Sequence, residues 1–467
     1  MAVSAPGSYA VVAKSSIPSG EIIARIPCSA LFCVRYSDLA KKHALQQALG
    51  RYASTLCLAL CVLHEQEIGA RSTYASYLEL IPDVCLPMAW DSKSEASTWL
   101  RGTEASRILQ RQEYAYKHGL KYTGTCYTEL AMFWHDVGES ILYDALGAKV
   151  SWKAFVRAFS LVSSRAFVID VFHGLCMVPL ADMFNHAAPS NLQVESDMEV
   201  CLQCGSNEHI ECHVVSANGN IPPNTVDIRT IEPLDAGEEA LNSYGELGNA
   251  ELLCQYGFVS DTKSGWERCS WDIRLPSERE ELCNCLGCDP AALDNVEQVR
   301  SLEPIYAAQM QRDLCDDGLA PAYTDEDGLA HDFAPISQKN RHDQLCPLFV
   351  DAVGRVSWPL WRLALGLENQ ICSRIHPLDS HLAHWHADRS VSLTPRVKTA
   401  CERIVQLCQV RLEQLRVFHE DQSIDPPSST SDALHFAVQH AWQDMSILQA
   451  CQGRYDTGCT DMGGLST

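Results

Sequence analysis

The stretch Pro179-Leu180-Ala181-Asp182-Met183-Phe184-Asn185-His186 ends an apolar segment in two polar side chains. An amide and an imidazole in this setting need hydrogen-bond partners, because burying either one unpaired costs about 1–3 kcal/mol. Two Tyr-Gly steps follow, at Tyr244 and Tyr256, and each places a phenol beside a flexible backbone. Taken singly, an Asn-His pair also fits a capped turn, and a Tyr-Gly step also fits a strand end. Together they make residues 163–258 the richest source of candidate site residues.

Short strand-like runs flank a long helical segment. Residues 9–13 and 21–26 are rich in β-branched residues and are separated by a Pro-Ser-Gly turn signal. From Asp38 to about Phe159 the apolar residues recur at helical spacing. Strand-like runs then return at 167–179, 199–204, 209–215 and 226–231. We therefore predict a first domain over residues 1–270 with a helical insert at about 38–159.

The sequence pattern changes after about Trp271, where apolar residues recur at helical spacing between long acidic or Pro/Ser-rich loops. The predicted helices cover residues 278–286, 299–314, 345–371, 395–418 and 432–448. This pattern predicts a second, all-helical domain over residues 272–450. The small, polar tail at 453–467 is expected to be disordered.

Several common functional signatures are missing from the sequence. None of the 26 glycines is two positions from another, so the chain contains no G-x-G. This excludes the dinucleotide-binding fingerprint and the kinase glycine loop, and no P-loop, H-E-x-x-H or G-x-S-x-G occurs either. A nucleotide-like cofactor on a Rossmann sheet is accordingly disfavoured.

Net charge and composition limit the classes of binding partner and the cellular compartment that we expect. The 467 residues contain 36 Lys+Arg and 59 Asp+Glu, a net charge of −23, which argues against direct nucleic-acid binding and permits a basic substrate. The longest apolar run, Leu56 to Leu63, is too short to span a bilayer, and the N-terminus does not read as a signal peptide. The 22 cysteines are dispersed, as expected for free thiols in a reducing compartment. We expect a cytoplasmic or nuclear protein without membrane association.

In combination and in this order, the motifs resemble those of the SET-domain protein methyltransferases. The resemblance is strongest to the branch with the Rubisco large-subunit and ribosomal-protein lysine methyltransferases, and it covers residues 8 to about 260. The matching segments are Val12–Lys14, Gly20–Ile23, Ser76–Pro82, Ser164–Phe167, Ala181–His186, Asn242–Gly245 and Gln255–Phe258.

This resemblance implies an α+β fold: a SET β fold with a helical insert, followed by a helical substrate-binding domain. It implies S-adenosyl-L-methionine as cofactor and methyl transfer to lysine of a non-histone basic protein, such as a ribosomal protein, by a monomer. A lysine amine, with a pKa near about 10.4, must lose its proton before it attacks a methyl group. An apolar channel beside a sulfonium charge favours that loss.

The resemblance also implies residue roles. Tyr256 would orient the lysine amine near the sulfonium, and Tyr244 would line the lysine channel. Asn185 and His186 would hold the cofactor together with Tyr256, and Ser164 would contribute nearby.

Two further residues fall on the peptide or cofactor side of the implied site. Arg165 and Asp182 would shape the binding of the substrate. The alternative for this pair is a structural ion pair beneath the site.

The sequence departs from the family at the first strand, where the family usually has G-x-G. Here the aligned residues are Ser8-Tyr9-Ala10, with Gly7 just before them, and a Cβ at these positions would crowd the cofactor. A SET fold that binds without turnover is therefore one alternative, and histidine methylation on the same scaffold is another. Trp266 and Trp271 are candidates for the aromatic that packs on adenine.

Two cysteine clusters invite comparison with metal sites. Cys201, Cys204, His209, Cys212 and His213 offer enough ligands for tetrahedral zinc, but their spacing is not that of a standard zinc knuckle. The only function this cluster favours, a zinc-dependent nucleic-acid binder, conflicts with the net charge. Cys283, Cys285 and Cys288 lie in a predicted helix that favours buried thiols. We assign no metal ligand.

Overall fold

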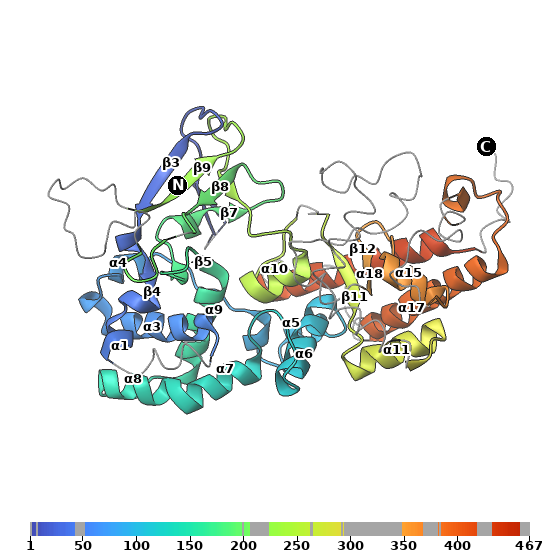
Figure 1. The fold of residues 1–467 in the computed structure, drawn as a ribbon, viewed down its shortest axis with the longest axis horizontal. Coiled ribbons are helices and arrows are strands. Elements are labelled where there is room, and N and C mark those ends of the chain that lie inside the picture. Colours follow the sequence, from blue (N-terminus) through green and yellow to red (C-terminus); the bar gives the residue numbers. More distant parts are fainter. Residues whose placement is uncertain are drawn as a thin grey trace. The chain divides into compact units, whose positions relative to one another are not determined.

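The computed structural model describes residues 2–5, 8–42, 52–198, 200–205, 224–261, 265–290, 293, 348–367, 382, 384–417 and 432–457 (Figure 1). The chain divides into two compact units. The first unit comprises Met1–Trp90, Gly124–Gly245 and Leu252–Phe258, and the second comprises Asp91–Thr123, Glu246–Glu251 and Val259–Thr467. Asp91–Thr123 lies within the predicted insert but packs with the second unit. No helix of the described ranges has the length and apolar character needed to cross a membrane.

The strands of the first unit form small sheets. Their members are β1 (Ala2–Ala5) with β2 (Ser8–Ala10); β3 (Ile22–Pro27), β9 (Thr225–Thr230) and β8 (Leu192–Glu195); β4 (Phe32–Cys33), β6 (Leu175–Met177) and β5 (Ala166–Val168); and β7 (Asn185–His186) with β10 (Leu241–Asn242). The central strand β9 alternates buried and partly exposed residues, because successive strand side chains point to opposite faces. Figure 1 shows β3, β9 and β8 side by side.

Helices of the predicted insert supply much of the first unit's core. They are α1 (Asp38–Lys42), α3 (Ser54–Ile68), α4 (Ala75–Leu78), α7 (Tyr127–Phe133), α8 (Glu139–Leu146) and α9 (Trp152–Arg165). The run Leu56–Leu63 of α3 is buried on every side, as expected for a helix that is hydrophobic all round. Helix α9 packs against α3, begins at the capping hydroxyl of Ser151, and passes directly into β5.

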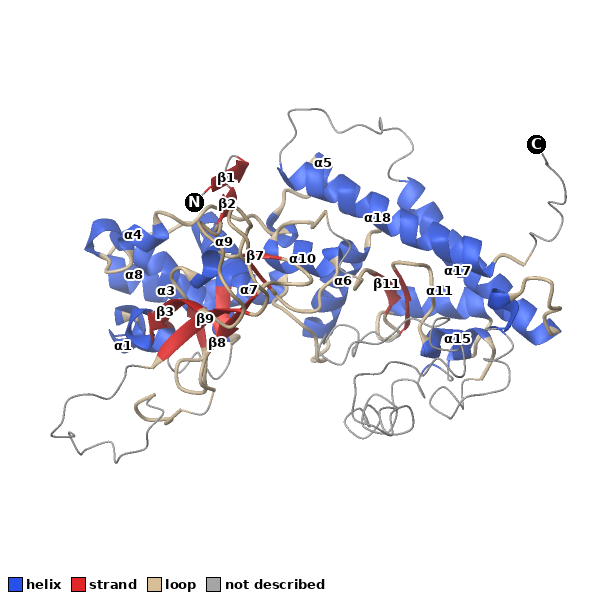
Figure 2. Cartoon of the chain, turned by 90° about the horizontal axis from the view of Figure 1, so that it is seen from above, coloured by secondary structure: helices blue, strands red, loops and turns tan. Residues whose placement is uncertain are grey.

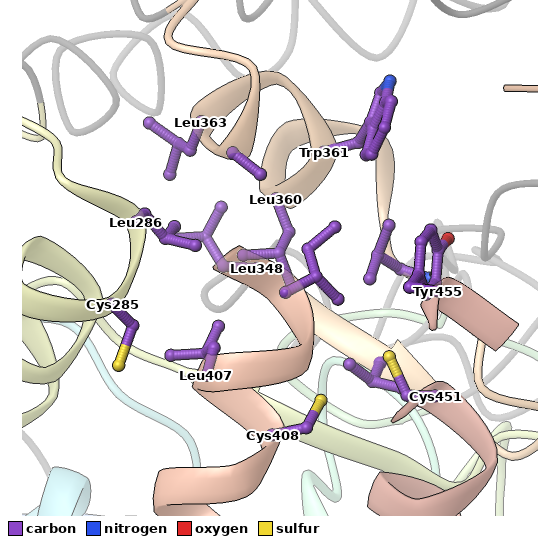
Figure 3. Packing of buried hydrophobic residues seen from close by; sticks show 14 of the residues in the cluster. Cys285, Leu286, Leu348, Leu360, Trp361, Leu363, Leu407, Cys408, Cys451 and Tyr455 are labelled. Carbon is purple, nitrogen blue, oxygen red and sulfur yellow. The ribbon is translucent and has the colours of Figure 1, made fainter. Parts of the chain in front are cut away.

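The second unit is mainly helical. Its elements are α5 (Glu95–Leu100), α6 (Glu104–Lys117), β11 (Arg268–Trp271), α11 (Pro276–Leu286), β12 (Leu348–Asp351), α15 (Trp358–Ala364), α17 (Pro395–Val417) and α18 (Asp432–Tyr455). Helices α17 and α18 run side by side (Figure 2). Leu407 and Cys408 of α17 and Cys451 and Tyr455 of α18 belong to one buried cluster with Leu360 (Figure 3).

A buried charge network ties α6 to α17 in the second unit. The Glu104 carboxylate accepts a 2.8 Å hydrogen bond from Arg111 Nη1 and also pairs with Arg411. These three side chains are 1%, 5% and 0% exposed. Charges this deeply buried depend on their partners, because a lone buried charge carries a large desolvation cost.

The α+β class is confirmed, and the structure corrects its details. The second unit is not all-helical, because Leu348–Asp351, predicted as helix, forms β12 and pairs antiparallel with β11. The first three residues of this run are apolar and suit a buried helix as well as a buried strand. Its strand partner, β11, lies far away in the sequence. The turn at Gly354, whose φ is +78°, lets the chain reverse before α15 begins.

Other predicted elements have mixed outcomes. The helices predicted at 278–286, 395–418 and 432–448 are confirmed as α11, α17 and α18 over their described residues. The predicted strand at 199–204 is wrong for residues 200–205, which turn through a Gly205 N–H to Cys201 carbonyl hydrogen bond of 2.8 Å. The predicted disordered tail is wrong at its start, because α18 continues to the fully buried Tyr455. The predicted elements at 209–215 and 299–314, and the tail after Thr457, lie outside the described residues.

Candidate active site

The Asn-His pair is strand β7, which pairs in parallel with β10 in the first unit. The Asn185 amide donates a 2.7 Å hydrogen bond to Glu239 Oε1. The His186 Nδ1 accepts a 3.1 Å hydrogen bond from the backbone N–H of Tyr244. The partners that these side chains need thus come from both sides of β10, because Glu239 precedes this strand and Tyr244 follows it.

The two Tyr-Gly steps converge on this strand pair. The rings of Tyr244 and Tyr256 stack with their centroids 4.7 Å apart and their planes at 28°. Phe258 approaches both rings edge-on, at 6.3 Å and 6.5 Å. The ring of His186 lies 5.2 Å from that of Tyr244. We call His186, Tyr244, Tyr256 and Phe258 the aromatic cluster.

The second Tyr-Gly step requires its glycine. Gly257 follows α10 (Asn249–Tyr256) with a φ of +80°, in the left-handed region that other residues rarely adopt. A Cβ at this position would lie 2.8 Å from the Cγ1 atom of Val84. The glycine therefore lets Tyr256 and Phe258 reach the cluster from the two sides of one tight turn.

Tyr244 is fixed at both ends. Its phenol donates a 3.0 Å hydrogen bond to the carbonyl oxygen of Phe184, just before the Asn-His pair. Burial raises the pKa of Tyr244 to about 12, so the phenol stays protonated and keeps donating at neutral pH. Burial also lowers the pKa of His186, and a hydrogen bond with the backbone of Asn242 partly opposes this effect.

Arg165 and Asp182 meet, as expected, and a third residue joins them. The Arg165 Nη1 donates to the backbone oxygen of Asp182 at 2.8 Å and lies 3.7 Å from its Oδ2. The phenol of Tyr77 donates to the same Oδ2 at 2.9 Å. The pKa of Asp182 is raised because burial outweighs the Arg165 charge and the Tyr77 hydrogen bond. Among the residues that the structure describes, its buried Oδ1 has no hydrogen-bond partner, and neither does Nε of Arg165.

Tyr77 and Ser163 are site residues to which sequence reasoning gave no role. Tyr77 lies within the matching segment Ser76–Pro82, which was the available signal for it. Ser163 precedes the predicted Ser164, and its hydroxyl donates a 3.2 Å hydrogen bond to the carbonyl of Gln255, next to Tyr256. The Ser164 hydroxyl instead donates within α9, to the Leu161 carbonyl at 3.2 Å. The cofactor role of Ser164 stays a prediction.

The candidates outside this cluster are placed as follows. Residues 8–10 form β2 with a buried Ala10, and Gly7 lies outside the described residues. Trp271 is buried in the second unit and donates from Nε1 to Glu281 at 2.6 Å, while Trp266 lies near the guanidinium of Arg268.

The cysteine clusters give no metal site in the part of the chain that the structure describes. There, no group of three or more His, Cys, Asp or Glu side chains is arranged to hold a metal ion. Cys204 is exposed, whereas the other three proposed partners of Cys201 and Cys204 lie outside that part. Cys285 and Cys288 are buried, as predicted, whereas Cys283 is only partly buried.

Comparison with known proteins gives the same class as the fold and the site. No family model matches the chain. Solved structures of the SET domain of LSMT with lysine and AdoHcy, and of Rubisco LSMT with sinefungin and monomethyllysine, superpose with TM-scores of 0.53 and 0.52. They cover 96% of this chain and 84% of theirs, at 17% and 16% identity. The chain therefore has the SET-domain fold of LSMT.

Several of the curated proteins that are similar in sequence are named as lysine methyltransferases. Ribosomal lysine N-methyltransferase 3 of Saccharomyces cerevisiae is 24% identical over 327 residues, which is 54% of this chain and 57% of the relative. The N-lysine methyltransferase SETD6 of Bos taurus is 26% identical over 297 residues, 60% of this chain and 57% of the relative. The chain thus spans little more than half the length of these curated relatives. The predicted resemblance to SET-domain lysine methyltransferases of the Rubisco and ribosomal-protein branch is confirmed.

Proposed function

We propose that this protein transfers a methyl group from S-adenosyl-L-methionine to a lysine of a non-histone basic protein, such as a ribosomal protein. The observation that carries the proposal is the aromatic cluster packed against the Asn185-His186 strand. The names of the sequence relatives support the same reaction.

The aromatic cluster suits the proposed cofactor. S-adenosyl-L-methionine supplies an electrophilic methyl group on a positively charged sulfur. Aromatic faces attract cations, so the stacked rings of Tyr244 and Tyr256 suit this positive charge. We assign Asn185, His186 and Tyr256 to holding the cofactor, with Ser164 nearby.

The chain's own groups prepare the amine. The side chains of the aromatic cluster are half-buried, and desolvation beside them disfavours an ammonium group and favours release of its proton. The Tyr256 phenol is assigned to orient the amine, and alignment of this kind supplies much of the rate of a displacement reaction. Tyr244 helps to position the Asn-His strand, because its protonated phenol donates a hydrogen bond to the carbonyl oxygen of Phe184.

Arg165, Asp182 and Tyr77 form the proposed substrate side. The unpartnered Oδ1 of Asp182 is an acceptor suited to a donor of the incoming peptide. The net charge of −23 favours encounter with basic proteins. The same charge suits a monomer without direct contact to nucleic acid or membrane. The dispersed cysteines suit the cytoplasm or nucleus.

The test combines binding with product analysis. Calorimetric titration with S-adenosyl-L-methionine should give micromolar binding to the wild type and to Tyr256→Phe, and none to the Asn185→Ala/His186→Ala double variant. Radiolabelled cofactor and a basic ribosomal-protein fraction should then yield methyl-lysine on hydrolysis. Tyr143→Phe, at an exposed tyrosine of the first unit, is the matched control. Absence of cofactor binding to folded wild type, or methylhistidine as the product, would refute the proposal.

A further inference from the structure

Cys33 and Cys176 face each other on neighbouring strands of the first unit. Strands β4 and β6 pair antiparallel, with Cys33 directly opposite Cys176. Residues directly opposite in such a pair have Cα atoms about 4.5 or 5.5 Å apart. Disulfides span Cα separations of about 4.4–6.8 Å, so the separation of either pairing type lies within the range that a disulfide bridges.

The surroundings give the two thiols different reactivity. The pKa of the Cys33 thiol is lowered, first by a hydrogen bond from the Cys176 thiol, against the opposing effect of burial. Backbone hydrogen bonds from Tyr36 and Arg35 and the charge of Arg35 also lower it. The pKa of Cys176 is raised by the same thiol pair. The Cys176 thiol also donates to the carbonyl oxygens of His173 and Gly174 at 3.6 Å, and these bonds stabilise its protonated form. Since the thiolate is the nucleophile, Cys33 is the attacking residue and Cys176 the resolving one.

Two other buried thiols of the same unit provide a contrast. Cys57 and Cys61 lie one turn apart on α3, and burial raises the pKa of each to about 12. They belong to a single helix, whereas Cys33 and Cys176 come from two strands. Burial alone therefore does not distinguish the cross-strand pair, but its opposed geometry and its polar surroundings do.

The pair is buried, and so is the strand that carries Cys33. Both side chains are 0% exposed, as is Phe32, the other residue of β4. Strand β4 is an edge strand of the sheet β4-β6-β5, so it is hydrogen-bonded to one neighbouring strand, β6. Oxidation of Cys33 therefore requires a transient opening of β4 from β6.

We propose that Cys33 and Cys176 are a redox-active pair that hydrogen peroxide closes into a reversible cross-strand disulfide. The Cys33 thiolate attacks one peroxide oxygen, the O–O bond breaks, and a sulfenic acid forms while the departing hydroxide takes a proton to become water. The Cys176 thiol then attacks the sulfenic sulfur, the S–S bond forms, and a second water leaves. Two thiols lose two electrons and two protons, and the peroxide is reduced to two waters.

The bond would fasten two parts of the first unit that are distant in sequence. Its loop encloses α3 and α9, which form much of this unit's core. Closing a long loop restricts the unfolded chain, so the oxidised protein should melt at a higher temperature than the reduced one.

Peptide mapping of the full chain tests the pair directly. The protein is treated with hydrogen peroxide or with dithiothreitol, free thiols are blocked with N-ethylmaleimide, and a non-reducing digest is examined by mass spectrometry. A linked peptide containing Cys33 and Cys176, lost on reduction and accompanied by an upward melting shift, is expected. Linkage of Cys33 chiefly to Cys28, or no linkage at peroxide levels that oxidise the exposed Cys204, would overturn the proposal.

Variants then assign the melting shift. Cys176→Ser should abolish both the linked peptide and the shift, whereas the control Cys57→Ser should keep both. A shift of unchanged size in Cys176→Ser would show that another bond causes it. The wild-type map decides the linkage even where a variant folds poorly, and it does not depend on the methyltransferase activity.

Discussion

The Tyr77 phenol lies 2.9 Å from Oδ2 of Asp182 and so joins two sequence motifs that are 105 residues apart. Tyr77 lies in α4, whereas Asp182 lies in the turn that leads into the Asn-His strand. The hydrogen bond therefore couples the helical insert to the candidate active site.

Tyr77→Phe should destabilise the protein and weaken substrate binding. Losing a hydrogen bond to a buried carboxylate costs about 1.5–3 kcal/mol, and the pKa of Asp182 should rise further without this donor. Tyr74→Phe is the matched control, because the Tyr74 phenol donates to a neutral carbonyl, that of Leu31, at 3.1 Å. Urea unfolding of both variants should show the larger loss for Tyr77→Phe, together with a higher KM for the protein substrate. Equal losses and an unchanged KM would show that the Tyr77 contact is an ordinary packing feature.

Tyr256→Phe should lower kcat by about 10²-fold while cofactor affinity stays within a few-fold of wild type. The ring would still stack on Tyr244, but the hydroxyl assigned to orient the amine would be lost. Single-turnover kinetics would separate the chemical step from binding, with Tyr143→Phe as the control. An unchanged rate of the chemical step would remove Tyr256 from the mechanism.

Local sequence pattern was sufficient for the parts of the site that are continuous in the chain. The apolar run ending in Asn185-His186 predicted a need for polar partners, and Glu239 and the Tyr244 backbone supply them. The convergence of Tyr244 and Tyr256 followed from resemblance to a family. Spacing alone could not place two rings 4.7 Å apart across a turn and a helix.

Features that depend on long-range pairing were beyond the sequence pattern. The hydrogen bond between Tyr77 and Asp182 could not be read from the residues around either one, since each environment is ordinary when taken alone. Strand β12 was mistaken for helix for the same reason: its four residues become a strand only when β11 lies beside them. The opposition of Cys33 and Cys176 likewise exists only in the register of the folded sheet.

The stability of the protein should fall in acid partly through His186. Its folded-state pKa is lowered below the ordinary value of about 6.5, so its contribution is present above that pH and is lost as pH falls through the folded pKa. Protonation of Nδ1 would also remove the acceptor for the Tyr244 N–H. His186→Asn keeps an acceptor without titrating, so its unfolding free energy should vary less with pH between about 5 and 7. Identical pH profiles for the two proteins would contradict this role of His186.

Glu104→Gln should destabilise the second unit by about 3–5 kcal/mol, because the fully buried Arg411 loses its carboxylate partner and Arg111 is left with the carboxylate of Glu278. Glu413→Gln is the control, since Glu413 is exposed on α17 and its carboxylate accepts a 2.7 Å hydrogen bond from the neutral amide of Gln409. Urea denaturation followed by tryptophan fluorescence would measure the difference. A loss below 1 kcal/mol, as roughly expected for an exposed pair, would mean that the buried network tolerates the missing charge.

Gly257→Ala should destabilise the first unit and disturb the aromatic cluster. The alanine must adopt a φ of +80°, which costs about 1–2 kcal/mol, and its Cβ would also lie 2.8 Å from Val84 Cγ1. Gly147→Ala separates these effects, because Gly147 has a φ of +69° but a Cβ there would meet no heavy atom within 4 Å. Calorimetric melting should show a greater loss for Gly257→Ala, and Val84→Ala in the same chain should recover the part due to the clash. If the two glycine variants melt alike, the close approach to Val84 carries no energetic weight, and only the backbone conformation holds Tyr256 and Phe258 in place.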